Sequence, residues 1–243
     1  SRLSALCQVT VAEQQREFVS GRHIEDNLFM LESAAMAFSA TNIRRAAIIL
    51  FDFSTAFPSI AHAWIFLVLT AMGIPACFIA AVQLLYLNCS AGLIFNGMEL
   101  DAIFIASGIK QGCPLSGSIF ALAIDPLIRY LLAASVLGSM QITAYADDLA
   151  IVIANLFTQL PLILQAFNSW ALASCLNLNT KKSAVLPLWN FDDAFIRPSL
   201  RFAAPRFAAC IIQSYAKYLG IVLGPGPSDL VGSCRAQGAG TIR

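Results

Sequence analysis

The stretch "ITAYADDLAIVI", residues 142–153, places two adjacent aspartates, Asp147 and Asp148, between two apolar runs. Apolar segments on both sides of a short polar turn predict a β-hairpin that is buried except at its tip. Burying an unpaired carboxylate costs free energy, and two neighbouring carboxylates also repel each other. A divalent cation would compensate both charges, so the pair indicates a metal site. From these residues alone, a plain polar hairpin tip remains an equally good interpretation.

Other segments of the chain carry strand signals. Residues 46–54, "AAIILFDFS", form a short run of strand formers that ends near Asp52. Residues 91–109 surround the turn pair Asn96-Gly97 and predict a second hairpin. Residues 182–188 and 217–224 are further strand candidates.

Helical signals alternate with these strands. Apolar periodicity predicts helices over residues 61–72, 76–87, 119–137 and 160–176, and Pro126 predicts a kink or break in the third. Intermingled helices and strands with antiparallel pairs predict an α+β fold. We therefore expect an antiparallel sheet with helices packed on one face.

Composition is consistent with one large domain. The chain has 243 residues, of which 58% are hydrophobic and only 12% are charged, with a net charge of +1. Acidic residues predominate up to about residue 180 and basic residues after it. This asymmetry is consistent with ordinary solvated surface, or with a cation-binding centre followed by a phosphate-contacting flank.

Cysteine spacing and hydropathy bear on the location of the protein. The seven cysteines show no zinc-ligand spacing, and we expect reduced thiols in a protein of the nucleus or cytoplasm that is not secreted. Residues 53–98 contain no charged side chain, which raises a membrane-spanning alternative. Gly73 and Pro75 interrupt this run and favour two packed helices, so no membrane association is expected.

The aspartates predict a specific ion chemistry. If the strand ending near Asp52 lies beside the hairpin, its carboxylate joins those of Asp147 and Asp148. Oxygen ligands without histidine or thiolate favour Mg²⁺, or Mn²⁺, over zinc. Two such ions about 3.5–4 Å apart form a clamp used in phosphoryl transfer.

Five segments occur in a characteristic order: "FDFSTAFPSI", "GIKQGCPLSGSIF", "AYADDLAIV", "LNLNTKKSAVLPL" and "KYLGIVLG". Together they resemble the palm motifs of a reverse transcriptase from the non-LTR (LINE-like) retrotransposon branch. The upstream segment "QQREFVSGRHIEDNLFMLE" resembles the one that precedes the palm in that branch. The resemblance covers roughly residues 3–224. It implies part of the fingers in residues 1–45 and a palm in residues 46–224, with no thumb. The Gly/Ser/Pro-rich residues 225–243 predict a disordered tail.

The resemblance also implies catalytic roles. Asp52 and Asp147 match the ligands of two Mg²⁺ ions, with Asp148 as the partner that shapes the charge of the site. Lys182 matches a lysine near the triphosphate, where it would protonate or neutralise the leaving pyrophosphate. Tyr145 is expected near the primer terminus.

Further residues match positions that contact the nucleotide and the primer. Phe57 matches an aromatic gate that excludes the ribose 2′-hydroxyl, the group that separates RNA from DNA precursors. Gln111 and Gly112 match the loop beneath the incoming nucleotide. The expected primer grip consists of Tyr218, Leu219 and Gly220.

The implied function is RNA-directed DNA polymerisation. The expected partners are an RNA template, a DNA primer from the target site, dNTPs, and the fingers, thumb and endonuclease of a larger polyprotein. Thr55, Pro58, Gly117 and Cys175 depart from the pattern typical of the branch, but none is a ligand or the gate. An inactive retroelement remnant and an RNA-dependent RNA polymerase are the alternatives, and Phe57 argues against the second. As an isolated chain we expect poor activity.

Overall fold

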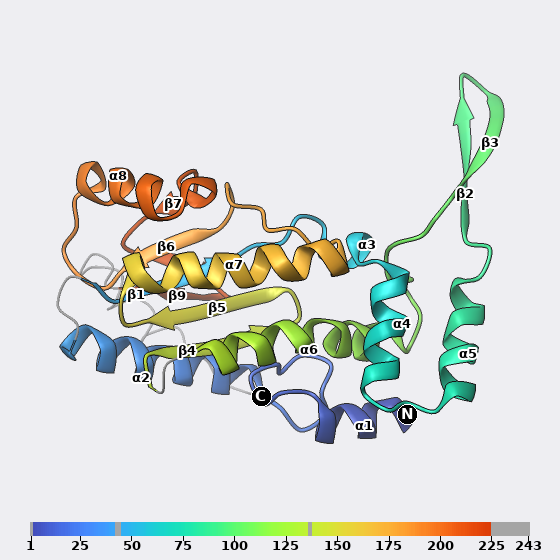
Figure 1. Ribbon diagram of the computed structural model, residues 1–243, viewed down its shortest axis with the longest axis horizontal. Helices are drawn as coiled ribbons and strands as arrows, with labels where there is room; N and C mark the ends of the chain where they lie inside the picture. The colour runs from blue at the N-terminus through green and yellow to red at the C-terminus, as the bar shows by residue number, and fades with distance from the viewer. Residues whose placement is uncertain (1, 42–44, 136–137, 225–243) are drawn as a thin grey trace, which may run out of the picture.

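The computed structural model describes residues 2–41, 45–135 and 138–224, and a five-stranded sheet forms its centre (Figure 1). The strand order is β4-β5-β1-β6-β7, and every neighbouring pair is antiparallel except β6 and β7. The strands are β1 (Ala47–Phe51), β4 (Met140–Tyr145), β5 (Asp148–Ile153), β6 (Ala184–Pro187) and β7 (Ile211–Ile212). The predicted strand and aspartate hairpin are thus confirmed, in a mixed rather than purely antiparallel sheet. The predicted disordered tail, residues 225–243, lies outside the described residues.

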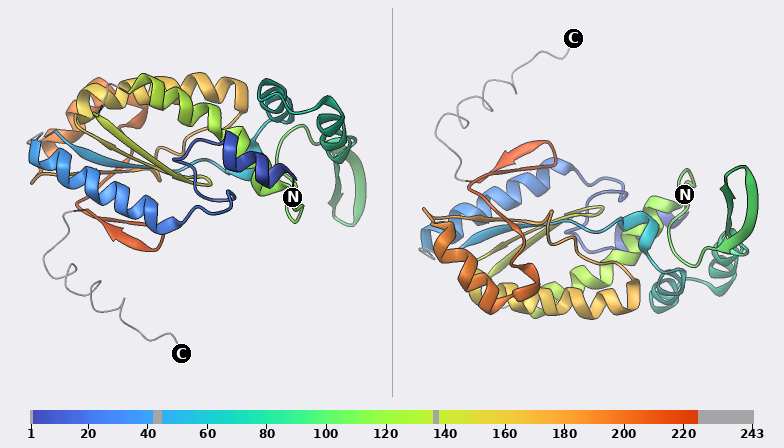
Figure 2. Two further views of the ribbon diagram at one scale, coloured as in Figure 1. Left: turned by 90° about the horizontal axis from the view of Figure 1, so that it is seen from below. Right: turned by 90° about the horizontal axis from the view of Figure 1, so that it is seen from above.

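Both faces of the sheet are covered (Figure 2). Helices α6 (Ser116–Ala134), α7 (Leu156–Ser174) and α8 (Asp193–Ala203) contribute to the larger core on one side. Helix α2 (Ile24–Thr41) and a small hairpin of β8 (Ala216–Tyr218) and β9 (Ile221–Leu223) cover the other side. The α+β class is confirmed, but the expectation of helices on one face only is wrong.

The sequence of β1 explains why a second cover is needed. Successive side chains of a strand point to opposite faces. Ile49 and Phe51 belong to the core beneath α6 and α7, whereas Ile48 belongs to the smaller core beneath α2. A strand that is apolar on both faces has to be buried on both faces.

Helix α6 continues through Pro126 as one helix, so of the predicted kink or break the break does not occur. Proline inside a helix costs about 3 kcal/mol or more, because it removes a hydrogen bond and crowds the preceding turn. Ile124, Leu127 and Ile128 on either side of it are almost fully buried, and this apolar burial offsets the cost. Helix α6 is also long and apolar enough to cross a membrane by length and composition, and 61% of an 18-residue stretch of it is buried inside the fold.

A second region extends from the sheet at the end opposite α8 (Figure 1). It consists of α4 (His62–Ala71), α5 (Ala76–Tyr86), and a hairpin of β2 (Ser90–Phe95) and β3 (Met98–Phe104). The two predicted helices and the Asn96-Gly97 hairpin are confirmed. Asn96 and Gly97 both have positive φ, at 50° and 79°, as the tight type I′ turn requires. All residues of β2 and β3 are exposed.

The shorter elements connect these parts. They are α1 (Arg2–Thr10), α3 (Ala56–Ser59) and the 3₁₀ helix η1 (Pro205–Phe207). All six cysteines in the described part of the chain are free thiols, and only Cys7 and Cys210 are buried.

Candidate active site

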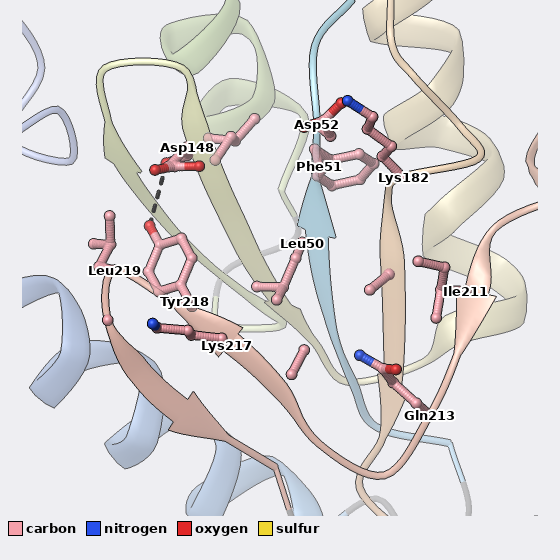
Figure 3. A pocket seen from close by; sticks show the side chains of 14 residues that line it. Leu50, Phe51, Asp52, Asp148, Lys182, Ile211, Gln213, Lys217, Tyr218 and Leu219 are labelled. Atoms are coloured by element: carbon pink, nitrogen blue, oxygen red, sulfur yellow. Dashed lines mark hydrogen bonds between the residues drawn. The ribbon is translucent and has the colours of Figure 1, made fainter.

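The pairing of β1 with β5 brings two of the predicted aspartates together. Phe51 is the Cα partner of Leu149 in this antiparallel pair, so Asp52 at the end of β1 comes next to Asp148 at the start of β5. Both residues are even-numbered and share the sheet face of Leu50 and Ala150, which belongs to the α2 side. Figure 3 shows the two side chains at the same edge of neighbouring strands.

A cavity of about 470 Å³ opens at this edge. Asp52, Asp148 and Lys182 line it, and the side chain of Lys182 points toward Asp52 (Figure 3). All three residues of the expected primer grip line it as well. The remaining lining residues are Leu50, Phe51, Leu149, Ala184, Ile211, Gln213, Ala216 and Lys217.

The loop before β6 forms hydrogen bonds with both the backbone N–H and the backbone carbonyl of Asp52. The Asn179 N–H donates to the Asp52 carbonyl at 2.8 Å, and the Asp52 N–H donates to the Ser183 hydroxyl at 3.1 Å. The Ser183 hydroxyl in turn donates to the Asn179 carbonyl at 3.0 Å. Lys182 belongs to this loop, so one local hydrogen-bond network positions both Asp52 and Lys182.

Hairpin β8–β9 closes the cavity from the opposite side. The Tyr218 hydroxyl donates to the backbone carbonyl of Asp148 at 3.2 Å, which ties this hairpin to the start of β5. Tyr218 is buried, and burial raises the pKa of its phenol, with a further contribution from the Asp148 charge. The neutral phenol is therefore the stable hydrogen-bond donor at neutral pH.

The electrostatics of the site show excess negative charge. Burial raises the pKa of the Asp148 carboxyl, and the charges of Asp147 and Asp52 raise it further. Burial likewise raises the pKa of Glu17, with added repulsion from Asp147 and Asp148. Four acidic side chains thus act on one another electrostatically, a pattern that a bound cation would relieve.

The three aspartates do not form one cluster. Asp52 and Asp148 share the cavity, whereas Asp147 lies on the tight turn and is not among the residues that line it. Among the described residues, no group of three histidine, cysteine or acidic side chains is arranged to hold a metal. The donor set still suits Mg²⁺ or Mn²⁺ chemically, because it consists of hard carboxylate oxygens.

Phe57 lies outside the cavity in an aromatic group. Its ring is stacked on that of Phe120, with centroids 4.4 Å apart and planes 9° apart. Phe18 approaches it edge-on at 6.2 Å. Because Phe120 is fully buried, this stacking fixes the orientation of the partly buried Phe57 ring.

The remaining predicted residues are separate from the cavity. Gln111 and Gly112 lie in an exposed turn, where Gly112 has a φ of 82°. The Ser116 hydroxyl donates to the Lys110 carbonyl at 2.5 Å and closes this turn onto α6. Tyr145 pairs with Asp148 across the β4–β5 hairpin and is partly buried.

Sequence reasoning missed three residues of the site. Lys217 and Gln213 line the cavity, and Glu17 adds a charge that acts on the aspartates. Lys217 directly precedes a predicted primer-grip residue, and its position in a strand could have indicated it. Nothing in the local sequence indicates Glu17, because 130 intervening residues separate it from Asp148 in the chain.

Comparisons with known proteins agree with the fold and the motifs. A family model described as "Reverse transcriptase (RNA-dependent DNA polymerase)" matches residues 1–223. The transposon TX1 uncharacterized 149 kDa protein of Xenopus laevis is 28% identical over 229 residues, which are 91% of this chain and 17% of that protein. The Pol polyprotein from the type-2 retrotransposable element R2DM of Drosophila melanogaster is 33% identical over 142 residues, 57% of this chain and 13% of that polyprotein. The chain therefore spans less than a fifth of either relative.

Solved structures with the same fold include telomerases. Apo telomerase from Candida tropicalis, truncated from its C-terminal domain, superimposes with a TM-score of 0.63 at 10% identity, covering 92% of this chain and 42% of that one. Telomerase from Candida albicans in complex with a TWJ fragment of telomeric RNA gives 0.56 at 8% identity, covering 92% and 35%. At these identities the likeness shows the fold alone. On the family match over residues 1–223, the chain belongs to the reverse transcriptase family, and its curated relatives are non-LTR retrotransposon proteins.

Proposed function

We propose that this domain adds deoxynucleotides to the 3′-hydroxyl of a primer under the direction of an RNA template. The observation that carries the proposal is the shared cavity of Asp52, Asp148 and Lys182. Two carboxylates and one lysine on a concave surface match what nucleotidyl transfer requires: cation ligands and a positive group for the triphosphate.

In this proposal the aspartates hold divalent cations. Asp52 and Asp148 from the cavity, together with Asp147 from the turn, would bind Mg²⁺ or Mn²⁺, two ions in the active complex. When bound, such ions would neutralise phosphate charge and favour deprotonation of the attacking hydroxyl. The raised pKa of Asp148 supports the proposal, because its neighbouring charges make a cation favourable there.

The other residues of the cavity would act on the substrates directly. Lys182 would contact the triphosphate and stabilise the pyrophosphate as it leaves, either by charge or by giving it a proton. Tyr218, Leu219 and Gly220 face the aspartates across the cavity, where they would hold the end of the primer. Tyr145, which pairs with Asp148 at the end of β4, would contact the same primer end.

Phe57 would select the sugar. Its ring is held by stacking on Phe120, so it has little freedom to move away from a 2′-hydroxyl. A bulky ring at that place would reject ribonucleotides and favour dNTPs. Gln111 and Gly112, exposed on the turn before α6, would contact the nucleotide and template.

The proposed context is a retroelement protein of the nucleus or cytoplasm. The chain corresponds to 17% and 13% of its two curated relatives, so most of such a protein would lie outside it. We propose that an RNA template, target DNA as primer, and the remaining fingers, thumb and endonuclease are its partners.

A primer-extension assay tests the function. The chain is incubated with an RNA template, a labelled DNA primer, Mg²⁺ or Mn²⁺, and either dNTPs or rNTPs. We expect weak, template-dependent extension with dNTPs that is lost in Asp52→Asn and retained in Asp101→Asn, a matched change on exposed strand β3. Absence of extension by the wild-type chain and by a longer polypeptide that contains it would support the inactive remnant. Preferential use of rNTPs would support the RNA-dependent RNA polymerase.

A further inference from the structure

The turn that carries the aspartates has an unusual backbone. Ala146, which precedes Asp147, has a φ of 51°, a left-handed conformation that costs a residue with a Cβ about 1–2 kcal/mol. Asp147 is not among the positive-φ residues, so only the first central position of this two-residue turn is left-handed. Turns of that kind favour glycine at this position. A contact from outside the turn would offset this cost.

Gln15 makes that contact from a distant part of the chain. Its side-chain Oε1 accepts from the Ala146 N–H at 3.0 Å, and its Nε2 donates to the Ala146 carbonyl at 3.1 Å. One carboxamide thus binds both polar groups of one peptide residue, as a neighbouring strand would. Gln15 has 0% exposure and Ala146 has 3%, so water cannot replace these bonds.

The segment around Gln15 is itself firmly held. It runs parallel to edge strand β4, with the Ala144 N–H donating to the Gln14 carbonyl at 2.9 Å and the Arg16 N–H donating to the Ala144 carbonyl at 3.0 Å. The Arg22 guanidinium donates to the carbonyls of Ala12 and Gln15 at 2.5 and 2.6 Å.

Two buried polar groups fix the same segment to the helices. The Ala12 N–H donates to the Asp125 carboxylate of α6 at 2.6 Å. Asn27 of α2 donates to the Ala144 carbonyl at 3.0 Å and accepts from the Arg16 guanidinium at 2.9 Å. The segment that presents the Gln15 carboxamide is therefore held by hydrogen bonds to β4, α2 and α6.

We propose that Gln15 is a positioning residue of the polymerase site, which holds Ala146 left-handed and so sets the direction of Asp147 and Asp148. The inference rests on the proposed function. It assigns the N-terminal segment, residues 11–27, the task of supporting the carboxylates for cation binding. Metal ligands depend on such supporting hydrogen bonds, and loss of one commonly weakens metal affinity about 10- to 100-fold.

The test uses Gln15→Met, which keeps the length of the side chain but removes both hydrogen-bonding atoms. The matched control is Gln159→Met, because Gln159 donates to the Ser139 carbonyl and accepts from the Asn155 N–H at the opposite end of the same hairpin. The first readout is Mn²⁺ affinity, measured by electron paramagnetic resonance. The second readout is hydrogen exchange of the amides of residues 145–149.

We expect Gln15→Met to weaken Mn²⁺ binding about 10-fold or more and to speed exchange at the turn, whereas Gln159→Met does neither. The double variant Gln15→Met/Ala146→Gly should recover part of the affinity, since glycine adopts positive φ without the steric cost.

The outcomes separate this inference from the proposed function. Wild-type Mn²⁺ affinity in a folded Gln15→Met chain, with unchanged exchange at the turn, overturns the inference and leaves the function intact. Equal loss in Gln15→Met and Gln159→Met also overturns it, because that pattern indicates a general loss of stability. Failure of the wild-type chain to bind Mn²⁺ counts against the proposed function, and the positioning role for cation binding falls with it.

Discussion

The hydroxyl of Tyr218 donates a hydrogen bond to the backbone carbonyl of Asp148 over 3.2 Å, and so joins hairpin β8–β9 to the strand that carries the acid. The two residues are separated by 70 positions in the sequence. The contact links the hairpin expected to hold the primer directly to the residue whose carboxylate is expected to hold the cation.

Removing that hydroxyl tests the connection. Tyr218→Phe should lower the free energy of unfolding by about 1 kcal/mol, the typical net contribution of one hydrogen bond. Urea denaturation measures the change, and Tyr215→Phe, on an exposed tyrosine of the same region, serves as control. If the two substitutions have the same effect, the bond to Asp148 contributes nothing to stability.

Phe57 provides a test of sugar selection. Phe57→Val should raise the use of rNTPs relative to dNTPs about 10-fold or more, because the smaller side chain no longer fills the space of the 2′-hydroxyl. The ratio of kcat/KM values for the two substrates measures it. Phe202→Val, on a ring that is 92% exposed, should leave the ratio unchanged. An unchanged ratio for Phe57→Val would show that Phe57 does not exclude ribonucleotides.

In the absence of cations, the negative charge of Asp148 should lower the free energy of unfolding. Burial and the charges of Asp147 and Asp52 raise its pKa in the folded state above the unfolded value, so the charged form disfavours folding. Asp148→Asn should therefore raise the free energy of unfolding at neutral pH, while it abolishes primer extension. Asp101→Asn, on exposed strand β3, is the control.

The same pKa shift determines how the stability gain of Asp148→Asn depends on pH. The penalty is fully present above the folded pKa and disappears as pH falls to the unfolded value, about 3.9, where both states bind the proton. The stability advantage of Asp148→Asn, measured by urea denaturation, should shrink from pH 7 toward about pH 4. An advantage that grows on acidification would contradict the assigned direction of the shift.

Gly117 makes room for Phe18. A Cβ at Gly117 would lie 2.3 Å from the Cδ1 atom of the Phe18 ring, so Gly117→Ala should cost about 1–3 kcal/mol of stability. In a double-mutant cycle, Phe18→Ala should remove most of that cost. Gly92→Ala is the control, because nothing lies within 4 Å of its Cβ position. Additive effects of the two substitutions would show that the cost of Gly117→Ala does not come from contact with Phe18.

Hairpin β2–β3 should contribute little to the stability of the chain. Ile94, Phe95 and Phe104 are 73%, 63% and 66% exposed, so replacing all three with threonine should change the unfolding free energy by only about 0.5 kcal/mol per site. The same variant should self-associate less, because large exposed apolar surface promotes association. Thermal denaturation and light scattering measure the two effects. A large fall in melting temperature would show that these side chains pack inside the fold.

The secondary structure and the acidic residues that could be predicted from the sequence follow from local patterns of residues. Three predicted elements depend on neighbouring residues alone, and the structure contains all three. They are the strand before Asp52, the hairpin at Asn96-Gly97 and the hairpin that carries Asp147 and Asp148. Whether Pro126 breaks its helix could not be decided from the sequence, because its effect depends on the burial of α6, which local sequence does not report. Helix α2 was not predicted at all, and its packing on the second face depends on the apolar side chains of distant strands.

The sequence by itself determined the family, the identity of the acidic residues and four of the helices with most of the strands, because these depend on side chains close together in the chain. Only the tertiary structure decided that Asp148 and Asp52 share one cavity while Asp147 remains on the turn, since strand register selects the face. It also decided that Gln15 binds Ala146, 131 positions away. Such contacts arise when distant segments are buried together, and no periodicity along the chain encodes them.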